Sequence, residues 1–370
     1  MSRVVSGMRP TGRLHLGNYF GALKNWVGLV GAHDCRFFVA DWHMFTTGYD
    51  DPAKLPENTR EMVLDWLAAG LDPAKCVIFK QSDVPEHAEL ALLLGMVTPL
   101  SWLENNPTWK EQLQELSKTK ESLEREALAA AAAGGASKTA VKQAPEALAP
   151  GKHAAHELRT FGFLGYPVLQ AADILVHRGE KVPVGQDQVP HVELTREIAR
   201  KFNSIYGQVF PEPQPLLTPT PKLVGLDGRK MSKSYGNTIG LDETAESLAK
   251  KIMGAYTDPT KVKRDSPGHP EPSPENPPGC SVYALEKLYM SDAAKVQEIG
   301  ADCRAGKLGC VANKRENLLP AIEAQFALFR ERREKVTMKE VDELLAAGAE
   351  KARVDARATM KEVRRAMRLA

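Results

Sequence analysis

Residues 3–19 read RVVSGMRPTGRLHLGNY, and the fold follows from the pattern in this stretch. Its first six residues are mostly apolar and predict a short buried strand. Pro10 and Gly12 then break the chain into a tight turn, and apolar side chains at helical spacing predict a helix from Asn18 onward. A strand, a glycine turn and a helix N-terminus together form a general anion-binding arrangement. The stretch therefore predicts a site for a negatively charged ligand, which His15 and Asn18 can face.

The same strand–helix rhythm continues along the chain. Residues 35–40 and 76–80 are largely apolar runs of strand length, and residues 56–69 and 86–96 have helical spacing. This alternation predicts an α/β fold with a Rossmann-like, doubly wound parallel sheet. The helix at 86–96 is so apolar that it could belong to the core or to a subunit contact, and the sequence does not choose between the two.

Several polar side chains stand where α/β folds bind their ligands. Asp41 and His43 directly follow a predicted strand, at its carboxyl end. Gln170 and Asp173 lie three residues apart on the apolar helix predicted over 166–175. Because a buried carboxylate is costly without a partner, Asp173 either makes an interhelical hydrogen bond or accepts one from a ligand N–H or O–H.

A second strand end of this kind lies at residues 182–188, VPVGQDQ. The apolar part of this run opens into a glycine and three polar side chains, and a helix predicted over 191–202 begins just after it. A strand end that meets a helix N-terminus is suited to a ribose or a bound amine.

Residues 228–237, GRKMSKSYGN, form a cationic stretch with glycines near both ends. Its three cations are Arg229, Lys230 and Lys233, and the two lysines alternate with small hydroxyl side chains at 232 and 234. Such a run can be a solvated loop, or it can be a mobile flap that hinges at its glycines and closes over a polyphosphate. The alternation of ammonium groups and hydroxyls favours the flap.

The composition limits the classes of protein to consider. The chain has 370 residues, 43% hydrophobic and 26% charged, and a net charge of +2, as in ordinary soluble proteins of one or two domains. No apolar run has membrane-spanning length and no signal peptide precedes the first strand, so we expect a cytoplasmic protein without a membrane partner. Five cysteines, an odd number, argue against a secreted disulfide framework.

Two short motifs carry a resemblance to a known class of enzymes. The turn HLGN at 15–18 resembles the HIGH motif of class I aminoacyl-tRNA synthetases, and KMSKS at 230–234 matches the second signature of that class at every position. The finer resemblance is to the bacterial tryptophanyl-tRNA synthetase family, and it rests on SGMRPTG, YPVLQAADIL, PVGQDQ and HVELTR at 6–12, 166–175, 183–188 and 191–196. It covers nearly the whole chain except roughly 116–155, which reads as an insertion.

The resemblance implies an ATP-dependent ligase. L-Tryptophan would react with ATP to give tryptophanyl-adenylate and pyrophosphate, and the tryptophanyl group would pass to the 3′-terminal ribose of tRNA(Trp). Mg²⁺ would share the charge of the phosphates, and the chain would form a homodimer. The implied organisation is a catalytic domain over 1–236, with a helical insertion at about 108–155, and an α-helical tRNA (anticodon)-binding domain over 237–370 whose last helix packs back on the catalytic domain.

The resemblance also implies roles for individual residues. The catalytic residues would be His15, Asn18, Lys230 and Lys233. The ATP-binding residues would be Arg9, Pro10, Thr11, Gly17, Asn18, Gly185, Gln186, Asp187, Leu223, Lys230, Met231, Ser232, Lys233 and Ser234. The tryptophan-binding residues would be Val5, His43, Gln170, Asp173, Val182, Val184 and Gln188. Among these, Asp173 would accept the indole N–H, and a buried acceptor strongly rejects an analogue that lacks the donor.

Two alternatives remain open. The positions that depart from the common family pattern are Val5, Arg9, Asn18 and Gln170. Tyr166, Gln170 and Asp173 together also resemble tyrosyl-tRNA synthetases, which must bind a phenol. A catalytically silent, synthetase-like RNA-binding protein is the other alternative, and the presence of both ATP signatures argues against it.

The C-terminal part of the sequence predicts helices joined by a proline-rich connector over 259–279. The predicted helices are 245–254, 282–290, 314–335 and 339–367. The basic side chains Lys361, Arg364, Arg365 and Arg368 could contact RNA phosphates or could simply stabilise the end of the last helix.

Three cysteines of this region have a distinctive spacing. Cys280, Cys303 and Cys310 are separated by 22 and then 6 residues, and Asn313 follows two residues later. Some members of the family resembled carry a [4Fe–4S] cluster on C-x22-C-x6-C-x2-C, so the first three positions are candidate iron–sulfur ligands. Since four thiolates are the usual requirement, these side chains could instead be free cysteines at a relic site.

Overall fold

The structure is a computed structural model of the chain. It describes residues 1–49, 52–107, 109–110, 160–217, 223–229, 231 and 235–370. The helical insertion expected at about 108–155 therefore lies almost entirely outside the described residues, as do Lys230, Ser232, Lys233 and Ser234. Within the described part of the chain, no helix is both long and apolar enough to cross a membrane.

A parallel sheet of five strands forms the centre of the N-terminal part, as the sequence predicts. The strands are β1 (Arg3–Met8), β2 (Asp34–Val39), β3 (Val77–Lys80), β4 (Lys181–Val184) and β5 (Gln214–Leu217). Their order is β3-β2-β1-β4-β5, so the chain winds outward in one direction from β1 and then in the other from β4. The switch point of the sheet lies between these two strands, and crevices at such points are where α/β folds bind ligands.

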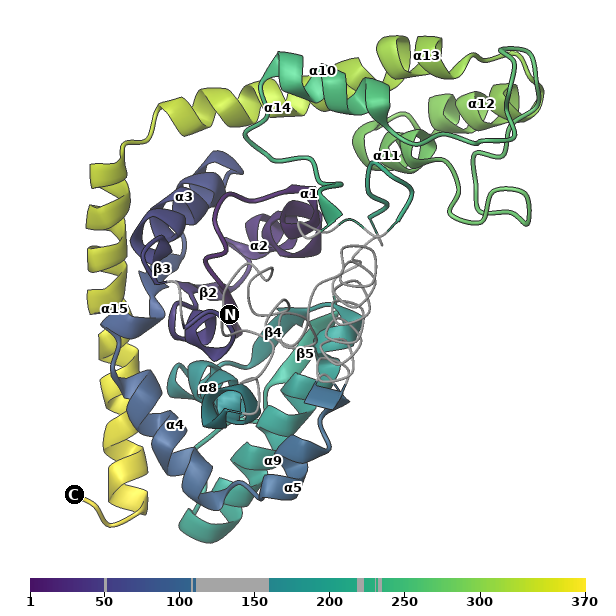
Figure 1. The fold of residues 1–370 in the computed structure, drawn as a ribbon. Helices are drawn as coiled ribbons and strands as arrows, with labels where there is room; N and C mark the ends of the chain where they lie inside the picture. Colours follow the sequence, from purple (N-terminus) through teal and green to yellow (C-terminus); the bar gives the residue numbers. More distant parts are fainter. Residues whose placement is uncertain (50–51, 108, 111–159, 218–222, 230, 232–234) are drawn as a thin grey trace, which may run out of the picture.

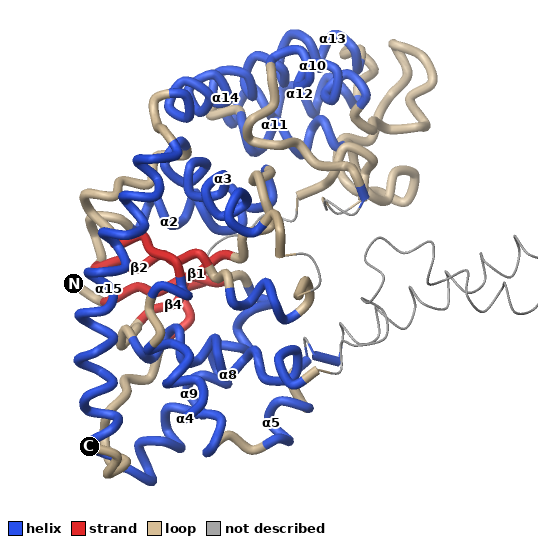
Figure 2. Tube along the Cα trace, turned by 60° about the vertical axis from the view of Figure 1, so that its left-hand side comes forward, coloured by secondary structure: helices blue, strands red, loops and turns tan. Residues whose placement is uncertain are grey.

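Helices cover both faces of this sheet (Figures 1 and 2). One face carries α2 (Lys24–Leu29) and α3 (Leu55–Ala68), and the other carries α4 (Glu86–Val97), α8 (Phe161–Val176) and α9 (Val189–Tyr206). Successive strand residues point to opposite faces. Accordingly, Val4 and Phe37 belong to one buried cluster, whereas Val5 and Phe38 belong to another. Burial on both faces explains why these strands read as continuous apolar runs.

The chain beyond the sheet is helical, as expected. Its helices are α10 (Ala245–Gly254), α11 (Ser281–Tyr289), α12 (Ala293–Arg304), α13 (Cys310–Asn313), α14 (Leu319–Glu334) and α15 (Met338–Ala366). Helices α12 and α13 were not predicted from the sequence. Asp292 caps α12 by accepting from the backbone N–H of Lys295, a signal that the sequence does contain.

The last helix returns to the sheet and runs along its β3 edge (Figure 1). Gly348 allows this contact, because a Cβ at this position would lie 1.7 Å from the carbonyl oxygen of Ile78 in β3. Farther along, Arg364 donates to Glu89 of α4 at 2.7 Å. Helix α15 therefore shields an edge that would otherwise expose unpaired backbone groups.

Two predicted helix starts need correction. Helix α8 begins at Phe161 rather than at Tyr166, because Thr160 caps it by accepting from the N–H of Phe163, and Pro167 therefore lies inside the helix. The first helix begins at Leu16 rather than at Asn18, and it continues as a π-helical turn over Tyr19–Leu23.

Candidate active site

A cavity of about 390 Å³ opens at the carboxyl ends of β1 and β4, at the switch point of the sheet. Strand and loop residues form one wall and helix α8 forms the opposite wall. The predicted site residues that line the cavity are Val5, Arg9, His43, Gln170, Asp173, Val182, Val184, Gly185 and Gln188. The structure thus places all seven candidate tryptophan-binding residues around one cavity.

Asp173 is the buried carboxylate of this cavity, with a relative exposure of 1%. Its Oδ2 lies 2.8 Å from Nε2 of His43, and its Oδ1 lies 2.7 Å from Nδ1 of His87. Gln81 Nε2 also donates to Oδ1, at 2.6 Å. Burial acts to raise the pKa of Asp173, but the hydrogen bonds from the two histidines hold it below its ordinary value. The carboxylate is therefore charged and ready to accept a further hydrogen bond.

The side chains behind Asp173 were not found by reasoning from the sequence. Gln81 follows β3 and His87 lies on α4, and both are fully buried. His87 Nε2 lies 3.0 Å from Nε2 of His177, which ends α8. Burial lowers the pKa of His177 well below its ordinary value, so this imidazole is neutral. The sequence position of Gln81 could have indicated a site residue, because Gln81 follows the carboxyl end of β3 as Asp41 follows that of β2.

The outer part of the cavity combines aromatic and polar groups. Tyr166, Gln170 and Asp173 project from one face of α8, and all three line the cavity. Oη of Tyr166 lies 3.4 Å from Nε2 of His191, a further lining residue that was not among the predicted ones. Burial raises the pKa of Tyr166 to about 12, so the phenol keeps its proton. The phenol of Tyr166 and the amide of Gln170 are therefore neutral polar groups in a cavity that also contains the charged carboxylate of Asp173.

The turn after β1 lies next to this cavity. Arg9 lines it, and burial lowers the pKa of this guanidinium. His15 caps helix α1 (Leu16–Asn18): its Nδ1 accepts from the N–H of Gly17 at 2.9 Å, while Asn18 Oδ1 accepts from the N–H of His15 at 3.2 Å. A Cβ at position 17 would meet the His15 ring at 2.5 Å, so any other residue there would displace the ring from its capping position. Two candidate catalytic side chains thus shape the helix N-terminus that the sequence predicted as an anion site.

Not every candidate ATP-binding residue borders the cavity itself. The described candidates outside its lining are Pro10, Thr11, His15, Gly17, Asn18, Gln186, Asp187, Leu223 and Met231. Gln186 and Asp187 lie in a 3₁₀ turn that directly follows the lining residue Gly185. Met231 is buried and donates its N–H to the carbonyl of Leu223 at 2.9 Å.

Part of the cationic stretch can be described. Arg229 Nε donates to Asp227 at 2.7 Å, and its guanidinium lies over the ring of Tyr235 at 4.5 Å. The pKa of Asp227 falls to about 2, because Asn237 and then Arg229 donate hydrogen bonds to it. Gly228 and Gly236 both have positive φ, at +85° and +63°. Arg229 is thus held within its own loop, whereas Lys230 and Lys233 lie outside the described residues.

The sequence left two possibilities open for the cysteine motif, an iron–sulfur site or free cysteines at a relic site. Cys280, Cys303, Cys310 and Asn313 do line one cavity, but its volume is only about 20 Å³. That volume holds about one water molecule, and a cluster of four irons needs more. Among the described residues, no three His, Cys, Asp or Glu side chains are grouped so that they could hold a metal ion. Asn313 accepts from Asn317 Nδ2 at 2.8 Å, and the geometry of these residues fits free cysteines better than a bound [4Fe–4S] cluster.

Comparison with known proteins finds the same family along nearly the whole chain. The family model described as tRNA synthetases class I (W and Y) matches residues 1–129 and 136–326. A tryptophan–tRNA ligase of Aquifex aeolicus is 48% identical over 99% of this chain and 100% of its own length, and one of Thermotoga maritima is 44% identical over 99% of both chains. A tryptophanyl-tRNA synthetase structure from Campylobacter jejuni, complexed with ADP and tryptophan, is 31% identical, covers 99% of both chains and has a TM-score of 0.76.

Proposed function

The chain belongs to the class I tRNA synthetase family for tryptophan and tyrosine, and from this premise we propose that it is an ATP-dependent ligase that joins L-tryptophan to tRNA(Trp). In the first step a carboxylate oxygen of tryptophan attacks the α-phosphorus of ATP, and pyrophosphate leaves. In the second step a hydroxyl of the terminal ribose attacks the activated carbonyl, and AMP leaves. No protein nucleophile is needed, so the chain must align the reactants and stabilise charge on the phosphates.

The observation that carries this proposal is the buried carboxylate of Asp173 in the cavity at the switch point. It has the right chemistry to accept the indole N–H of tryptophan inside a pocket that also contains the apolar side chains Val5, Val182 and Val184. Nε2 of His43 lies 2.8 Å from Oδ2 of Asp173. The indole N–H would therefore replace His43 at this oxygen or share the oxygen with it. Gln170 and Gln188 line the same cavity and supply polar contacts for the amino acid.

ATP would lie across the turn after β1. Arg9, Thr11, His15, Gly17 and Asn18 would hold it against the N-terminus of α1, where the helix dipole favours phosphate. The other residues proposed to bind ATP are Pro10, Gly185, Gln186, Asp187, Leu223, Lys230, Met231, Ser232, Lys233 and Ser234. Lys230 and Lys233 would close over the phosphates as negative charge moves to the leaving pyrophosphate.

Magnesium would reach the site with the nucleotide. The described residues contain no cluster of three metal-ligating side chains, and Mg²⁺ commonly keeps its waters and binds through substrate phosphates. When bound, the ion would neutralise part of the phosphate charge. The protein side chains would orient ATP around it.

The region from 237 to 370 would bind tRNA, with 1–236 as the catalytic domain, and two such chains would pair in the cytoplasm. This region is helical, and none of its residues lines the cavity. Both facts support a binding module that is separate from the catalytic site. Of the basic side chains on α15, Arg364 is engaged by Glu89 of α4. Lys361 and Arg365 are therefore better candidates for contact with RNA phosphates.

An ATP–pyrophosphate exchange assay with single amino acids tests the function. We expect exchange with tryptophan and much weaker exchange with tyrosine. Exchange with tyrosine but not with tryptophan would identify a tyrosine enzyme, in keeping with the position of Tyr166 and Gln170 on the cavity wall. Binding of tRNA without any exchange would instead identify a catalytically silent RNA-binding protein.

A further inference from the structure

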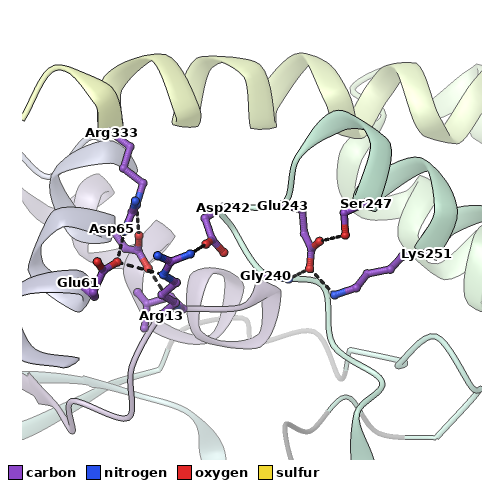
Figure 3. A network of polar contacts seen from close by, with 10 residues as sticks. Arg13, Glu61, Asp65, Gly240, Asp242, Glu243, Ser247, Lys251 and Arg333 are labelled. Atoms are coloured by element: carbon purple, nitrogen blue, oxygen red, sulfur yellow. Dashed lines mark hydrogen bonds and ion pairs between the residues drawn. The ribbon is translucent and has the colours of Figure 1, made fainter. Parts of the chain in front are cut away.

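Two carboxylates of α3, Glu61 and Asp65, lie one helical turn apart and face two elements at once (Figure 3). On one side is the turn after β1, which contributes Arg13 and Leu14 to the contacts. On the other side is Arg333 of α14, in the C-terminal helical region. Contacts between these residues join segments separated by up to 272 positions in the sequence.

Asp65 makes the central link. It has no exposed surface, and its Oδ2 accepts the backbone N–H of Leu14 at 2.8 Å. Its other oxygen, Oδ1, accepts from Arg333 Nε at 2.9 Å. The single carboxylate of Asp65 therefore connects Arg333 of α14 with the backbone just before His15.

Glu61 adds a second connection beside the first. Its Oε2 accepts from Arg13 Nε at 3.2 Å and also contacts Nη2 of Arg333. Arg13 in turn pairs with Asp242, in the segment that follows the cationic stretch. One carboxylate thus lies between an arginine of the turn and an arginine of the helical region (Figure 3).

Backbone hydrogen bonds hold the other side of the same turn. Leu16 donates its N–H to the carbonyl of Ile239, and Leu241 donates its N–H to the carbonyl of Leu14, both at 3.0 Å. Glu243, just beyond this segment, is held by Ser247 and Lys251 of α10, and Arg330 of α14 donates to its carbonyl at 2.8 Å. The turn therefore has firm contacts on both sides, and α14 participates in each.

We propose that Asp65 and Arg333 are positioning residues for adenylate formation, through which helix α14 sets the backbone of the ATP-binding turn. The inference rests on the proposed function. A buried ion pair of this kind does not need to add much stability, but removing one partner leaves a charge without compensation. Asp65 would then reorient or take up a proton, Leu14 would shift, and His15 and Asn18 would lose their alignment with the phosphates. The orientation of the tRNA-binding region and the chemistry of the first step are thereby coupled.

The titration of Asp65 offers an independent readout. Burial raises its pKa to about 6, while the hydrogen bonds from Leu14 and Arg333 act in the opposite direction. The charged groups around it are Arg333 on α14, Glu61 on α3, Arg13 in the turn and Asp242 in the loop. As the pH falls through about 6, the carboxylate becomes neutral and its attraction for Arg333 is lost.

The chain provides a matched control for the test. Arg60, also on α3, pairs with Asp342 of α15 at 2.8 Å, and both side chains are about half exposed. Arg60→Met therefore removes a charge pair between α3 and a C-terminal helix without touching the turn. Arg333→Met and Asp65→Asn remove the proposed link. In the second variant the oxygen of the introduced amide can still accept from the Leu14 N–H, but the amide has no charge with which to hold Arg333.

Pyrophosphate exchange should separate these variants. We expect Arg333→Met and Asp65→Asn each to lower kcat/KM for ATP, by up to about 100-fold for a misplacement near 1 Å, with KM for tryptophan almost unchanged. Arg60→Met should change kcat/KM for ATP and KM for tryptophan by at most about fivefold, because ion pairs at the protein surface contribute little. The double variant should lose little more than either single variant, and Arg333→Lys should recover part of the loss. Asp65→Asn should also remove the inflection near pH 6 from the wild-type rate profile.

Other results would overturn the inference. The inference fails if Arg333→Met behaves like Arg60→Met. It also fails if Arg333→Met impairs the kinetic constants for tryptophan and for ATP equally and lowers thermal stability, because Arg333 would then have only a structural role. If Arg333→Met does not fold, Arg333→Lys alone must still lower kcat/KM for ATP. A wild-type chain without exchange would contradict the proposed function, and calorimetric titration with ATP would then decide the inference separately. The positioning role requires weaker ATP binding by Arg333→Met than by Arg60→Met.

Discussion

His87 and Asp173 meet on the buried side of the candidate tryptophan pocket, where Nδ1 of the imidazole lies 2.7 Å from Oδ1 of the carboxylate. The two residues come from different helices, α4 and α8, and their exposed fractions are 0% for His87 and 1% for Asp173. Gln81 donates to the same oxygen. With Oδ1 held in this way, the carboxylate presents Oδ2 toward His43 and the cavity, so its orientation is set before a ligand arrives.

The first prediction concerns tryptophan binding. Asp173→Asn keeps the shape of the side chain but removes the negative acceptor, and the indole N–H would lose its partner. We expect tryptophan affinity to fall by about 1–3 kcal/mol, roughly five- to 150-fold, with KM for ATP unchanged. Asp41→Asn is the matched control, because Asp41 is also a buried carboxylate after a strand and accepts from the Ser82 N–H. Equal effects of the two changes on tryptophan binding would contradict the role of Asp173.

The second prediction concerns the cationic stretch. Lys233→Ala should slow adenylate formation by about 100- to 1,000-fold, the usual loss for one group that stabilises transition-state charge. Tryptophan affinity should change little, and single-turnover kinetics can measure the two separately. Arg229→Ala removes the same charge from the same stretch, but that charge is already paired with Asp227 and should matter far less. Equal losses of rate and of binding in Lys233→Ala would mean that the stretch is only a binding surface.

The third prediction concerns the packing of α15 on the sheet. Gly348→Ala would place a methyl group 1.7 Å from the Ile78 carbonyl oxygen, so the helix must move away from β3. We expect a loss of about 1–3 kcal/mol in the free energy of unfolding, measured by urea denaturation. Gly95→Ala is the control, because this exposed glycine of α4 has no atom near its Cβ position. That change should stabilise the chain by up to about 1 kcal/mol.

The fourth prediction concerns the dependence of stability on pH. Burial raises the pKa of Glu286 to about 8, with Asn313 acting in the opposite direction. An unfolded glutamate has a pKa of about 4.3, so the folded state binds this proton more tightly. The contribution of Glu286 to the free energy of unfolding is therefore most favourable below the unfolded pKa, declines as the pH rises to about 8, and is constant above it.

Glu286→Gln should remove this decline. The variant should gain stability relative to the wild type as the pH rises from about 5 to 8, in denaturation series across that range. Glu298→Gln, at an exposed position of α12 paired with Lys295, is the control and should follow the wild type. Parallel curves for the wild type and Glu286→Gln would show that the carboxyl group does not titrate in this range.

The sequence predicted the sheet and most helices because these features leave local patterns, whereas the resemblance to the family implied the cavity residues. Doubly covered strands appear as apolar runs, and the turn after β1 shows its proline, its glycines and the start of a helix. The two helices near the cysteines were not predicted, since their apolar spacing is weak. The candidate iron–sulfur ligands came from the family resemblance and its cysteine spacing, and spacing does not measure the room between the side chains.

By itself, then, the sequence determined the parallel α/β architecture and the motifs that resemble the family, and that resemblance implied which residues surround the ligand pocket. Only the tertiary structure decided how the buried charges are paired: Asp173 with His87 and Gln81, and Asp65 with Arg333. The reason is physical. Hydrophobic periodicity and turn-forming residues reflect interactions between neighbours in the chain. The hydrogen-bond partners of a buried carboxylate are instead the groups that the fold brings within about 3 Å of it. The residues that orient the candidate site therefore became visible only once distant helices were in place.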